Sequence, residues 1–250
     1  MTFKDHFSGH AGIYHEARPG YPAALFDWLA GIAPSRDLAW DAGCGNGQAS
    51  VALAERFVHV FATDPSATQI ANAEPCANVD YRVEPAEQCS LASASADLVT
   101  VAQALHWFDH ARFYAEVARV LKPGGVVAAW TYADCRVDAA IDPVKDRLYV
   151  DLTGSYWPPE RRHVESGYRT LDFPFDEQPA PSFEMTARWT LAQFLAYLRS
   201  WSATQRYLAD NGVDPVTLVE ADLAQAWGDA GVARCVRWDF HVRCGRVRNA

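Results

Sequence analysis

The segment Asp41-Ala42-Gly43-Cys44-Gly45-Asn46-Gly47 combines residue types that point directly to ligand chemistry. Its three glycines permit a tight turn and let a ligand lie against bare backbone. It follows an apolar run and precedes a helical pattern at 48–57, and a helix N-terminus offers free N–H groups with partial positive charge. A dinucleotide fingerprint would need glycine where Gln48 stands, so that pattern fails. An acidic residue before the glycines suits a ligand with an ammonium group better than a pyrophosphate.

Asp64 supplies a second signal, because it ends a predicted strand at 58–63 and lies 17 residues beyond Gly47. An acidic residue at this place can accept hydrogen bonds from both ribose hydroxyls. The structural alternative is helix capping near Pro65. A glycine turn and an acidic strand end together indicate an adenosine-type cofactor with little phosphate, and S-adenosylmethionine fits. Its zwitterionic methionine end would face Asp41 and the glycines, and its diol would face Asp64.

His106 and Trp107 follow the fourth predicted strand at its carboxyl end, where a ligand crevice is expected. Histidine can act as a general base or hydrogen-bond an acceptor oxygen near neutral pH. Trp107 can wall the site and exclude water. The structural alternative is a packed His-Trp pair in a strand-to-helix turn. Both interpretations stay open for His106.

The N-terminal segment holds Tyr14 and Arg18, ahead of Tyr21 and Pro22. One interpretation is a stiff turn entering a helix at 23–29, because proline is favoured at the first helical position. The other is a lid that closes over the cofactor and reaches the acceptor. The two are compatible.

Short apolar runs alternate with helical patterns up to residue 132, which predicts βαβ units and a parallel sheet. The expected fold is α/β, a doubly wound, Rossmann-like, seven-stranded sheet that is mostly parallel with an antiparallel last strand, plus a helical cap or insertion. The strands are expected at 38–41, 58–63, 79–83, 97–102, 126–132, 183–189 and 236–242, and the later helices at 111–121, 190–208 and 215–227. We expect a single domain over 1–250, with an N-terminal lid and helix segment at 1–35, a cofactor-binding core at 36–132, a proline-rich cap at 133–182 and C-terminal helices and closing strands at 183–250.

The chain resembles the class I S-adenosylmethionine-dependent methyltransferases over about residues 40–130. The matching segments are Asp41 to Gly47, Asp64, Pro85-Ala86-Glu87, Asp97 to Phe108 and Leu121-Lys122-Pro123-Gly124-Gly125. The resemblance implies that Ala86 and Glu87 lie along the adenine ring. Three further segments resemble the trans-aconitate methyltransferase-like, small-molecule subgroup: Tyr14 to Pro22, Gln103 to Phe108 and Trp201-Ser202-Ala203. The predicted cofactor-binding residues are Asp41, Gly43, Cys44, Gly45, Gly47, Asp64, Pro65, Ala86, Glu87 and Gln103, and the predicted catalytic residues are His106, Trp107, Tyr14 and Arg18.

Composition narrows the class of protein further. The formal charge is −9 and the sequence pI is near 5.3, which argues against a nucleic-acid partner. No window approaches the ~18 apolar residues of a membrane span, and the N-terminus has no apolar signal region, so a cytoplasmic protein is expected. The six cysteines match no zinc module, and no metal site is predicted.

We therefore expect a methyltransferase that acts on a small molecule at an oxygen, carboxylate or hydroxyl. A carboxylate needs no base, whereas a hydroxyl or amine would need one, and His106 is the first candidate. Arg188, Arg199 and Arg206 lie on or near the helix predicted at 190–208, and one facing the crevice would favour an anionic acceptor. The alternatives are a non-catalytic nucleoside-binding protein and a nicotinamide oxidoreductase, and Gln48 counts against the latter.

Overall fold

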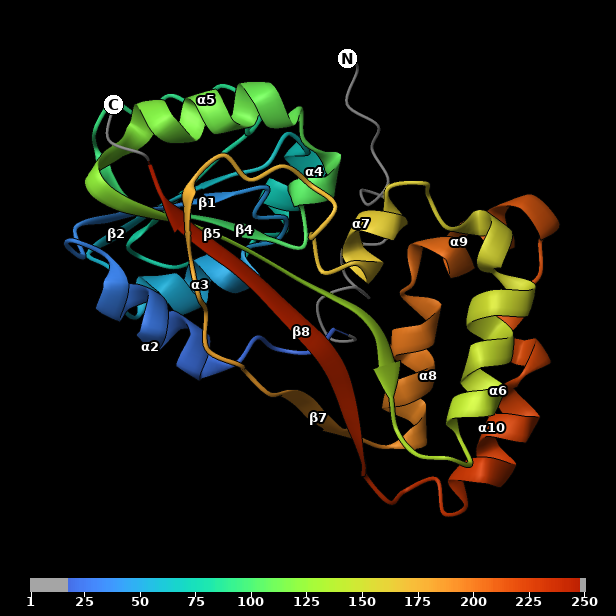
Figure 1. The fold of residues 1–250 in the computed structure, drawn as a ribbon. Coiled ribbons are helices and arrows are strands. Elements are labelled where there is room, and N and C mark those ends of the chain that lie inside the picture. Colours follow the sequence, from blue (N-terminus) through green and yellow to red (C-terminus); the bar gives the residue numbers. More distant parts are fainter. Residues whose placement is uncertain (1–17, 248–250) are drawn as a thin grey trace.

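The computed structural model describes residues 18–247, and an open sheet forms its centre (Figure 1). The strands are β1 (Leu38–Ala42), β2 (His59–Thr63), β3 (Val79–Arg82), β4 (Ala96–Ala102), β5 (Leu121–Arg136), β6 (Asp176–Gln178), β7 (Met185–Trp189) and β8 (Arg234–Arg246). Their order is β3-β2-β1-β4-β5-β8-β6, and β7 also pairs with β8. The first five strands are parallel, and β8 runs antiparallel to β5. The predicted mostly parallel sheet with an antiparallel last strand is confirmed.

The sheet contains eight strands where seven are predicted from the sequence. The additional strand is β6, within the proline-rich segment. Both β6 and β7 pair with β8 in antiparallel fashion, β6 near its end at residues 244–246 and β7 near its start at residues 234–238. The two short strands therefore lie one after the other along the same edge of β8. The sheet is seven strands wide, with its last edge interrupted between residues 178 and 185.

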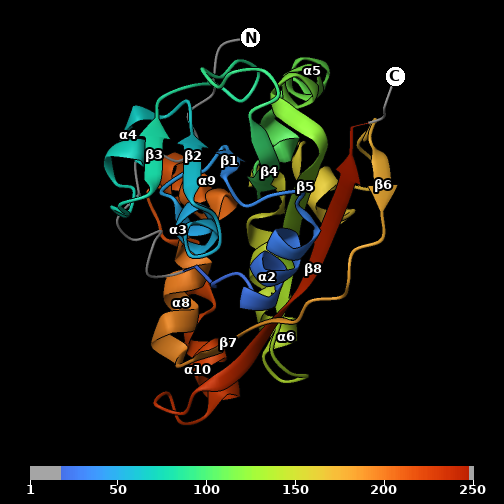
Figure 2. The ribbon, with the colours of Figure 1, turned by 90° about the vertical axis from the view of Figure 1, so that its left-hand side faces the viewer.

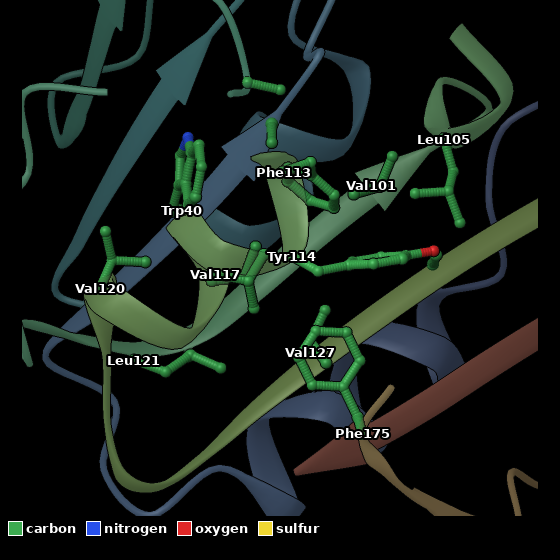
Figure 3. Packing of buried hydrophobic residues seen from close by; sticks show 14 of the residues in the cluster. Trp40, Val101, Leu105, Phe113, Tyr114, Val117, Val120, Leu121, Val127 and Phe175 are labelled. Atoms are coloured by element: carbon green, nitrogen blue, oxygen red, sulfur yellow. The ribbon is translucent and has the colours of Figure 1, made fainter. Parts of the chain in front are cut away.

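Helices cover both faces of the sheet (Figure 2). They are α2 (Ala23–Ile32) and α3 (Gln48–Ala54) on one face and α5 (His110–Val120) on the other, with α4 (Ala67–Ala71) after β2. Side chains of β5 alternate accordingly: Val126, Ala128 and Trp130 pack with the α2 and α3 side chains, while Val127 and Ala129 pack with those of α5. Figure 3 shows Phe113, Val117 and Val120 of α5 among this second set. This packing fixes the loops that follow β1, β2 and β4.

A helical lobe lies beside the sheet, and β5 and β8 both extend into it (Figure 1). Its helices are α6 (Asp142–Asp146), α7 (Arg161–Glu165), α8 (Leu191–Arg199), α9 (Ser202–Asn211) and α10 (Glu220–Trp227), with short turns η2 (Arg147–Leu152), η3 (Gly154–Tyr156) and η4 (Pro215–Leu218). Ile141 and Leu148 share one buried cluster with Phe194, Leu198 and Trp227. Segments before and after β6 and β7 thus pack into a common core.

The prediction of one helix over 190–208 is wrong, because α8 and α9 are separated at residues 200–201. Trp201 has extended backbone, with ψ 137°, and its buried ring packs edge-on against Tyr149 and Tyr197. Tryptophan is apolar and continues the helical pattern, so the break has no signal in the periodicity. The helix predicted at 215–227 likewise divides into η4 and α10. Among the described residues, no helix has the length and apolar character needed to cross a membrane.

Candidate active site

The glycine loop follows β1, and Asp41 is the next-to-last residue of that strand. Asp41 is fully buried, and its two carboxylate oxygens accept hydrogen bonds from the hydroxyls of Ser50, at 2.6 Å, and Thr100, at 3.0 Å. Burial raises the pKa of this carboxyl to about 6, and the two hydroxyl donors only partly oppose the shift. Asp41 therefore connects β1, α3 and β4. Its predicted contact with an ammonium group stays a prediction.

The backbone of the glycine loop is held against the end of β2. The N–H groups of Gly43 and Cys44 both donate to the carbonyl of Thr63, at 2.8 and 2.9 Å. Gly47 has φ +89°, and a Cβ there would meet the ring of Tyr81 at 2.9 Å. Only glycine fits such a conformation and such a close approach. The turn predicted from the glycine spacing is confirmed.

Asp64 lies at the end of β2, next to the glycine loop. Its Oδ2 accepts a hydrogen bond from the Gly45 N–H at 2.9 Å, and its Oδ1 accepts one from the Ser66 N–H at 2.8 Å. Ser66 in turn caps α4, and Pro65 is the residue between them. The residue is half-buried. The cap of α4 is thus Ser66 and not Asp64, which bonds to the backbone of that cap. The predicted contact of Asp64 with ribose stays a prediction.

The loop after β3 holds Ala86 and Glu87, the predicted adenine contacts. Ala86 is buried. The Glu87 carboxylate accepts a hydrogen bond from the N–H of Asp109, the residue that caps α5. Glu87 therefore ties this loop to the start of α5. Its predicted contact with adenine stays a prediction.

Gln103 follows β4 in a left-handed conformation, with φ +56°. Its Nε2 donates to the carbonyl of Tyr132 at 2.9 Å, and its Oε1 accepts from the Thr131 hydroxyl and from the Tyr132 N–H. The amide is thus bound to β5. These bonds direct the chain from β4 into the short helix η1 (Leu105–Trp107), which carries His106 and Trp107.

A cavity of about 70 Å³ lies beyond η1, between the sheet and the helical lobe. The segment after β4, the end of β5 and the lobe all contribute to it. The lining residues are Arg18, Gln103, His106, Trp107, Tyr132, Ala133, Trp157, Pro158, Arg161, Val164, Tyr197, Trp201 and Ser202. Aromatic rings form much of its wall, and two guanidinium groups are present among them.

Arg18 and Arg161 both line the cavity although they are 143 residues apart in the sequence. Arg18 donates to the carbonyl of Ser200 at 3.1 Å and lies over the Tyr197 ring, 5.8 Å from its centroid. Arg161 lies over the Trp157 ring at 4.5 Å and is 17% exposed. Aromatic faces attract guanidinium groups, each of which carries five N–H donors.

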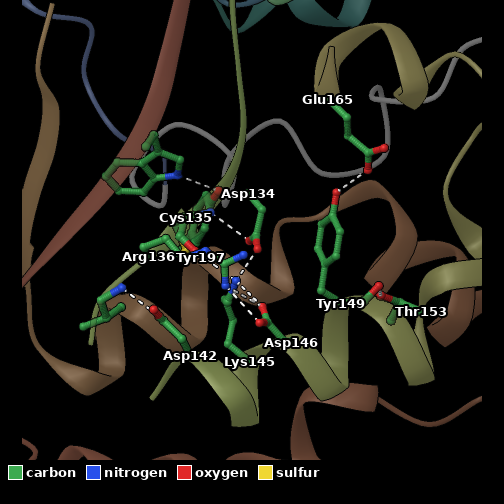
Figure 4. A network of polar contacts seen from close by, with 12 residues as sticks. Asp134, Cys135, Arg136, Asp142, Lys145, Asp146, Tyr149, Thr153, Glu165 and Tyr197 are labelled. Atoms are coloured by element: carbon green, nitrogen blue, oxygen red, sulfur yellow. Dashed lines mark hydrogen bonds and ion pairs between the residues drawn. The ribbon is translucent and has the colours of Figure 1, made fainter. Parts of the chain in front are cut away.

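Figure 4 shows Tyr149 and Glu165 in a polar network of the lobe, and Arg161 bonds to this network. The Nε of Arg161 donates to the Tyr149 hydroxyl at 3.1 Å, which donates to Glu165 at 2.8 Å. Nearby, the buried Lys145 ammonium bonds to Asp134, to Asp146 and to the Cys135 carbonyl. Lys145 thereby joins the end of β5 to α6.

His106 is paired on one side with a residue of the lobe. Its Nδ1 is 3.0 Å from the hydroxyl of Tyr168, and its ring lies 4.5 Å from that of Trp107. Burial lowers the pKa of His106 to about 3, and the positive charge of Arg161 adds to this effect. His106 is therefore neutral at pH 7.

Comparison with known proteins agrees with this geometry. Residues 40–129 match the family model described as a methyltransferase domain. A candidate methyltransferase of Dictyostelium discoideum is 33% identical over 231 residues, covering 90% of this chain and 87% of that protein. A solved structure of a candidate type II methyltransferase from Anaeromyxobacter dehalogenans is 49% identical, covers 93% of this chain and 99% of that one, and has a TM-score of 0.87.

The chain belongs to the S-adenosylmethionine-dependent methyltransferases. A candidate enzyme of this kind from Saccharomyces cerevisiae is also similar, 25% identical over 240 residues, with 81% of this chain and 82% of that protein covered. The predicted family, enzyme class and cofactor are confirmed.

The residues of this methyltransferase fit its cofactor. Gly43, Gly45 and Gly47 leave loop backbone without a covering side chain of their own, and the half-buried Asp64 bonds to the Gly45 N–H beside it. Gln48, which stands where a dinucleotide-binding chain needs glycine, donates its amide to the carbonyl of Pro19 at 3.0 Å. When bound, S-adenosylmethionine supplies an electrophilic methyl group. The loop and Asp64 would hold its methionine end and its ribose.

The cavity contains residues that sequence reasoning missed. Arg161, Trp157 and Tyr197 line the cavity, and Tyr168 contacts His106. All four lie in the lobe, where no motif marks them. Of the predicted residues, Arg18, Gln103, His106 and Trp107 line the cavity, and Tyr14 lies outside the described residues.

The sequence predicts an anionic acceptor if Arg188, Arg199 or Arg206 faces the crevice, and the structure places none of the three there. Arg199 is bound to Asp214 and Glu220, both at 2.7 Å. Arg188 and Arg206 donate to the carbonyls of Ala233 and Tyr156. The lining of the cavity includes none of the three. Aromatic residues of the second half of the chain serve both purposes: Tyr132 and Trp201 line the cavity, and Trp130 and Trp189 pack in buried clusters.

Proposed function

We propose that this methyltransferase transfers the methyl group of S-adenosylmethionine to an oxygen of an anionic small molecule, with a carboxylate as the preferred acceptor. The observation that carries the proposal is the pairing of Arg18 and Arg161 in one aromatic cavity beside η1. Arginine presents a planar fork of donors that matches a carboxylate, which makes such a cavity selective for this group.

The state of His106 favours a carboxylate over a hydroxyl or an amine. An efficient general base has a pKa near the operating pH, and the pKa of His106 is held at about 3. A carboxylate is already deprotonated at pH 7 and needs no base. The first candidate for a base is thus better suited to donate a hydrogen bond to an acceptor oxygen.

The reaction needs alignment more than proton transfer. The bond between sulfur and the methyl carbon breaks, its electron pair stays on sulfur, and the carboxylate oxygen forms the new bond. Arg18 and Arg161 would hold the acceptor, and alignment of two reactants can supply a large part of the rate enhancement. Trp107, Trp157 and Trp201 would exclude water from the reacting groups.

The N-terminal segment connects the two sides of the site, which supports the lid interpretation. The carbonyl of Pro19 accepts a bond from Gln48 at the start of α3, and Arg18 donates to Ser200 in the lobe. A segment bound to both sides can close over the cofactor once an acceptor is present. We propose that Tyr14 and Arg18 belong to this lid.

A screen of small carboxylic acids with methyl-labelled S-adenosylmethionine tests the proposal. We expect transfer to at least one acid, with a product whose label is released by mild alkali, as a methyl ester requires. The matched carboxamides, which lack the charge, are expected to be inactive. Label that is stable to alkali would show a different acceptor atom. Tight binding of S-adenosylmethionine with no transfer in acid, alcohol and amine sets would favour the non-catalytic alternative.

The finer family assignment is also part of this proposal. The resemblance to the trans-aconitate methyltransferase-like subgroup agrees with an anionic acceptor, and the subgroup stays a prediction. A small acceptor suits a cavity of about 70 Å³. The net charge of −9 argues against a nucleic-acid acceptor.

A further inference from the structure

Tyr168 is a buried residue of the lobe that touches the catalytic segment. It follows α7, is 1% exposed, and its ring centroid lies 5.9 Å from that of His106. Its hydroxyl and the Nδ1 of His106 are 3.0 Å apart. The pair joins the acceptor side of the lobe to the end of β4.

The backbone around this pair is strained. Tyr168 has φ +62° and Gln103 has φ +56°, a conformation that side-chain-bearing residues rarely adopt. Strain of this kind persists only where the surroundings fix it, and it is concentrated at functional sites. Here, the Tyr168 N–H donates to His163, and Arg243 donates to the Tyr168 carbonyl at 3.0 Å. The backbone of Tyr168 is thus held by contacts with α7 and β8.

The protons of this pair can be assigned from its neighbours. The backbone N–H groups of Leu105 and His106, at the start of η1, interact with the Tyr168 hydroxyl oxygen. That oxygen therefore already has donors directed at it. The Thr131 hydroxyl also interacts with the Tyr168 hydroxyl, and its own proton is used in the bond to Gln103. A buried hydroxyl proton needs an acceptor, and Nδ1 of His106 lies at hydrogen-bond distance from the Tyr168 hydroxyl, at 3.0 Å.

The charges around His106 keep the ring neutral. Arg161 and His163 face it from α7, and His110 faces it from α5. All three disfavour a second proton on the imidazole, in addition to burial. A neutral imidazole has one donor and one acceptor nitrogen, and the partner of one nitrogen decides which is which.

We propose that Tyr168 is a positioning residue that fixes His106 in the tautomer with the proton on Nε2, so that His106 presents an N–H donor toward the acceptor oxygen. Nδ1 and Nε2 point in nearly opposite directions, so Nε2 faces away from Tyr168, and His106 lines the cavity. The donor would hold one oxygen of the carboxylate while the other is methylated. This role rests on the proposed function, whereas the tautomer itself does not.

Long-range proton–nitrogen correlation spectra of the ¹⁵N-labelled protein, without acceptor, test the tautomer. The signals of His106 are assigned by their loss in His106→Gln. We expect the wild-type ring to show the Nε2–H pattern from pH 5 to pH 8 without titration. A proton on Nδ1, or a titration of His106 within this range, would overturn the proposal.

Variants then test whether Tyr168 determines the tautomer of His106. Tyr168→Phe removes the donor, so we expect a mixture of tautomers or the Nδ1–H form, with a titration midpoint higher than in the wild type. Tyr114→Phe is the matched control, because it removes another buried hydroxyl, which bonds to the Asp172 carbonyl. It is expected to leave the His106 signals unchanged. A wild-type pattern in Tyr168→Phe would show that Tyr168 does not set the tautomer.

Steady-state kinetics test separately whether the Nε2–H donor of His106 contributes to the reaction. On an acid found by the screen above, we expect Tyr168→Phe to lower kcat/KM by roughly tenfold, which is the loss of about one neutral hydrogen bond. The affinity for S-adenosylhomocysteine is expected to stay the same. If no acid is methylated, the proposed function fails while the spectra still decide the tautomer. If kcat/KM is unchanged in a variant with altered tautomer, the donor role is wrong.

Discussion

The cofactor side and the acceptor side of this methyltransferase are built in different ways. The proposed contacts to the methionine end and the ribose, the glycine loop and Asp64, lie within 24 consecutive residues at 41–64. The bonds of the cofactor side, such as that from Gly45 to Asp64, join neighbouring strand ends. The acceptor cavity takes Arg18, His106, Arg161 and Trp201 from distant parts of the chain. The residues of the cofactor side are thus close together in the sequence, whereas those of the acceptor cavity are brought together only by the tertiary fold.

This difference suggests that the two sides can be changed separately. The glycine loop contacts β2 and α3, whereas Arg161 depends on Tyr149 and Trp157 in the lobe. Two contacts link the sides: the segment at 18–19, and the segment 104–108, where Ala104 lies close to Gly43. Substitutions in one side should therefore affect one ligand much more than the other.

The largest effect is expected for Asp64→Ala. It removes a charged acceptor for the ribose and also the bonds that hold Gly45 and Ser66. Hydrogen bonds to charged groups contribute about 1.5–3 kcal/mol each, so binding of S-adenosylmethionine should weaken by roughly 100-fold or more. Titration calorimetry with S-adenosylhomocysteine measures the change.

Asp80→Ala is the matched control for that substitution. Asp80 lies on the neighbouring strand β3, and its carboxylate forms an exposed ion pair with Arg82. Such a pair contributes little, so cofactor binding should remain at the wild-type level. An Asp64→Ala protein that binds within threefold of wild type would remove Asp64 from the ribose site.

The same contrast explains what could be predicted from the sequence. The strand ends, the glycine turn and Asp64 follow from local patterns, because loop and ligand contacts lie close together in the chain. Arg161 and Tyr168 have no such signal, since their roles come from where α7 packs. Trp201 interrupts a helix although its apolar side chain continues the pattern. Edge strand β6 has the sequence Asp-Glu-Gln, which has no strand character.

A smaller effect, limited to the acceptor, is expected for Arg161→Ala. Loss of a charged partner for a carboxylate should raise the KM of the acid by roughly 30-fold, at about 2 kcal/mol. The affinity for S-adenosylhomocysteine should change less than twofold. Arg161→Lys should raise the KM of the acid nearly as much as Arg161→Ala does, because an ammonium group lacks the planar fork of donors. Steady-state kinetics and calorimetry measure the two ligands separately.

Arg147→Ala serves as the control for Arg161. Arg147 is in the same lobe, but its guanidinium lies at the surface and bonds to Asp222 and to the Leu218 carbonyl. Its loss should leave both ligands bound as in the wild type. If Arg161→Ala weakened cofactor binding as much as acceptor binding, the two sides would not be separable.

The smallest effect, on stability, is expected for Asp41→Asn. The pKa of Asp41 in the folded protein is about 6, above its ordinary value near 4. A carboxyl with a raised pKa favours folding below its unfolded pKa, and this contribution is lost as pH rises through 6. The ionised carboxylate thus costs stability at pH 7, by an amount on the order of 1–3 kcal/mol. An amide at this position carries no such cost, and the hydroxyls of Ser50 and Thr100 can rotate to bond with it.

Urea unfolding at several pH values checks the sign of this effect. The free energy of unfolding of Asp41→Asn, relative to wild type, should increase between about pH 4 and pH 7. Glu116→Gln should behave in the opposite way, because Arg119 lowers the pKa of Glu116 to about 2. That carboxylate stabilises the fold above its unfolded pKa, so Glu116→Gln should be less stable than wild type at pH 7, with the difference closing as pH falls toward 2. A pH-independent difference for Asp41→Asn would mean that Asp41 does not carry a destabilising buried charge beneath the glycine loop.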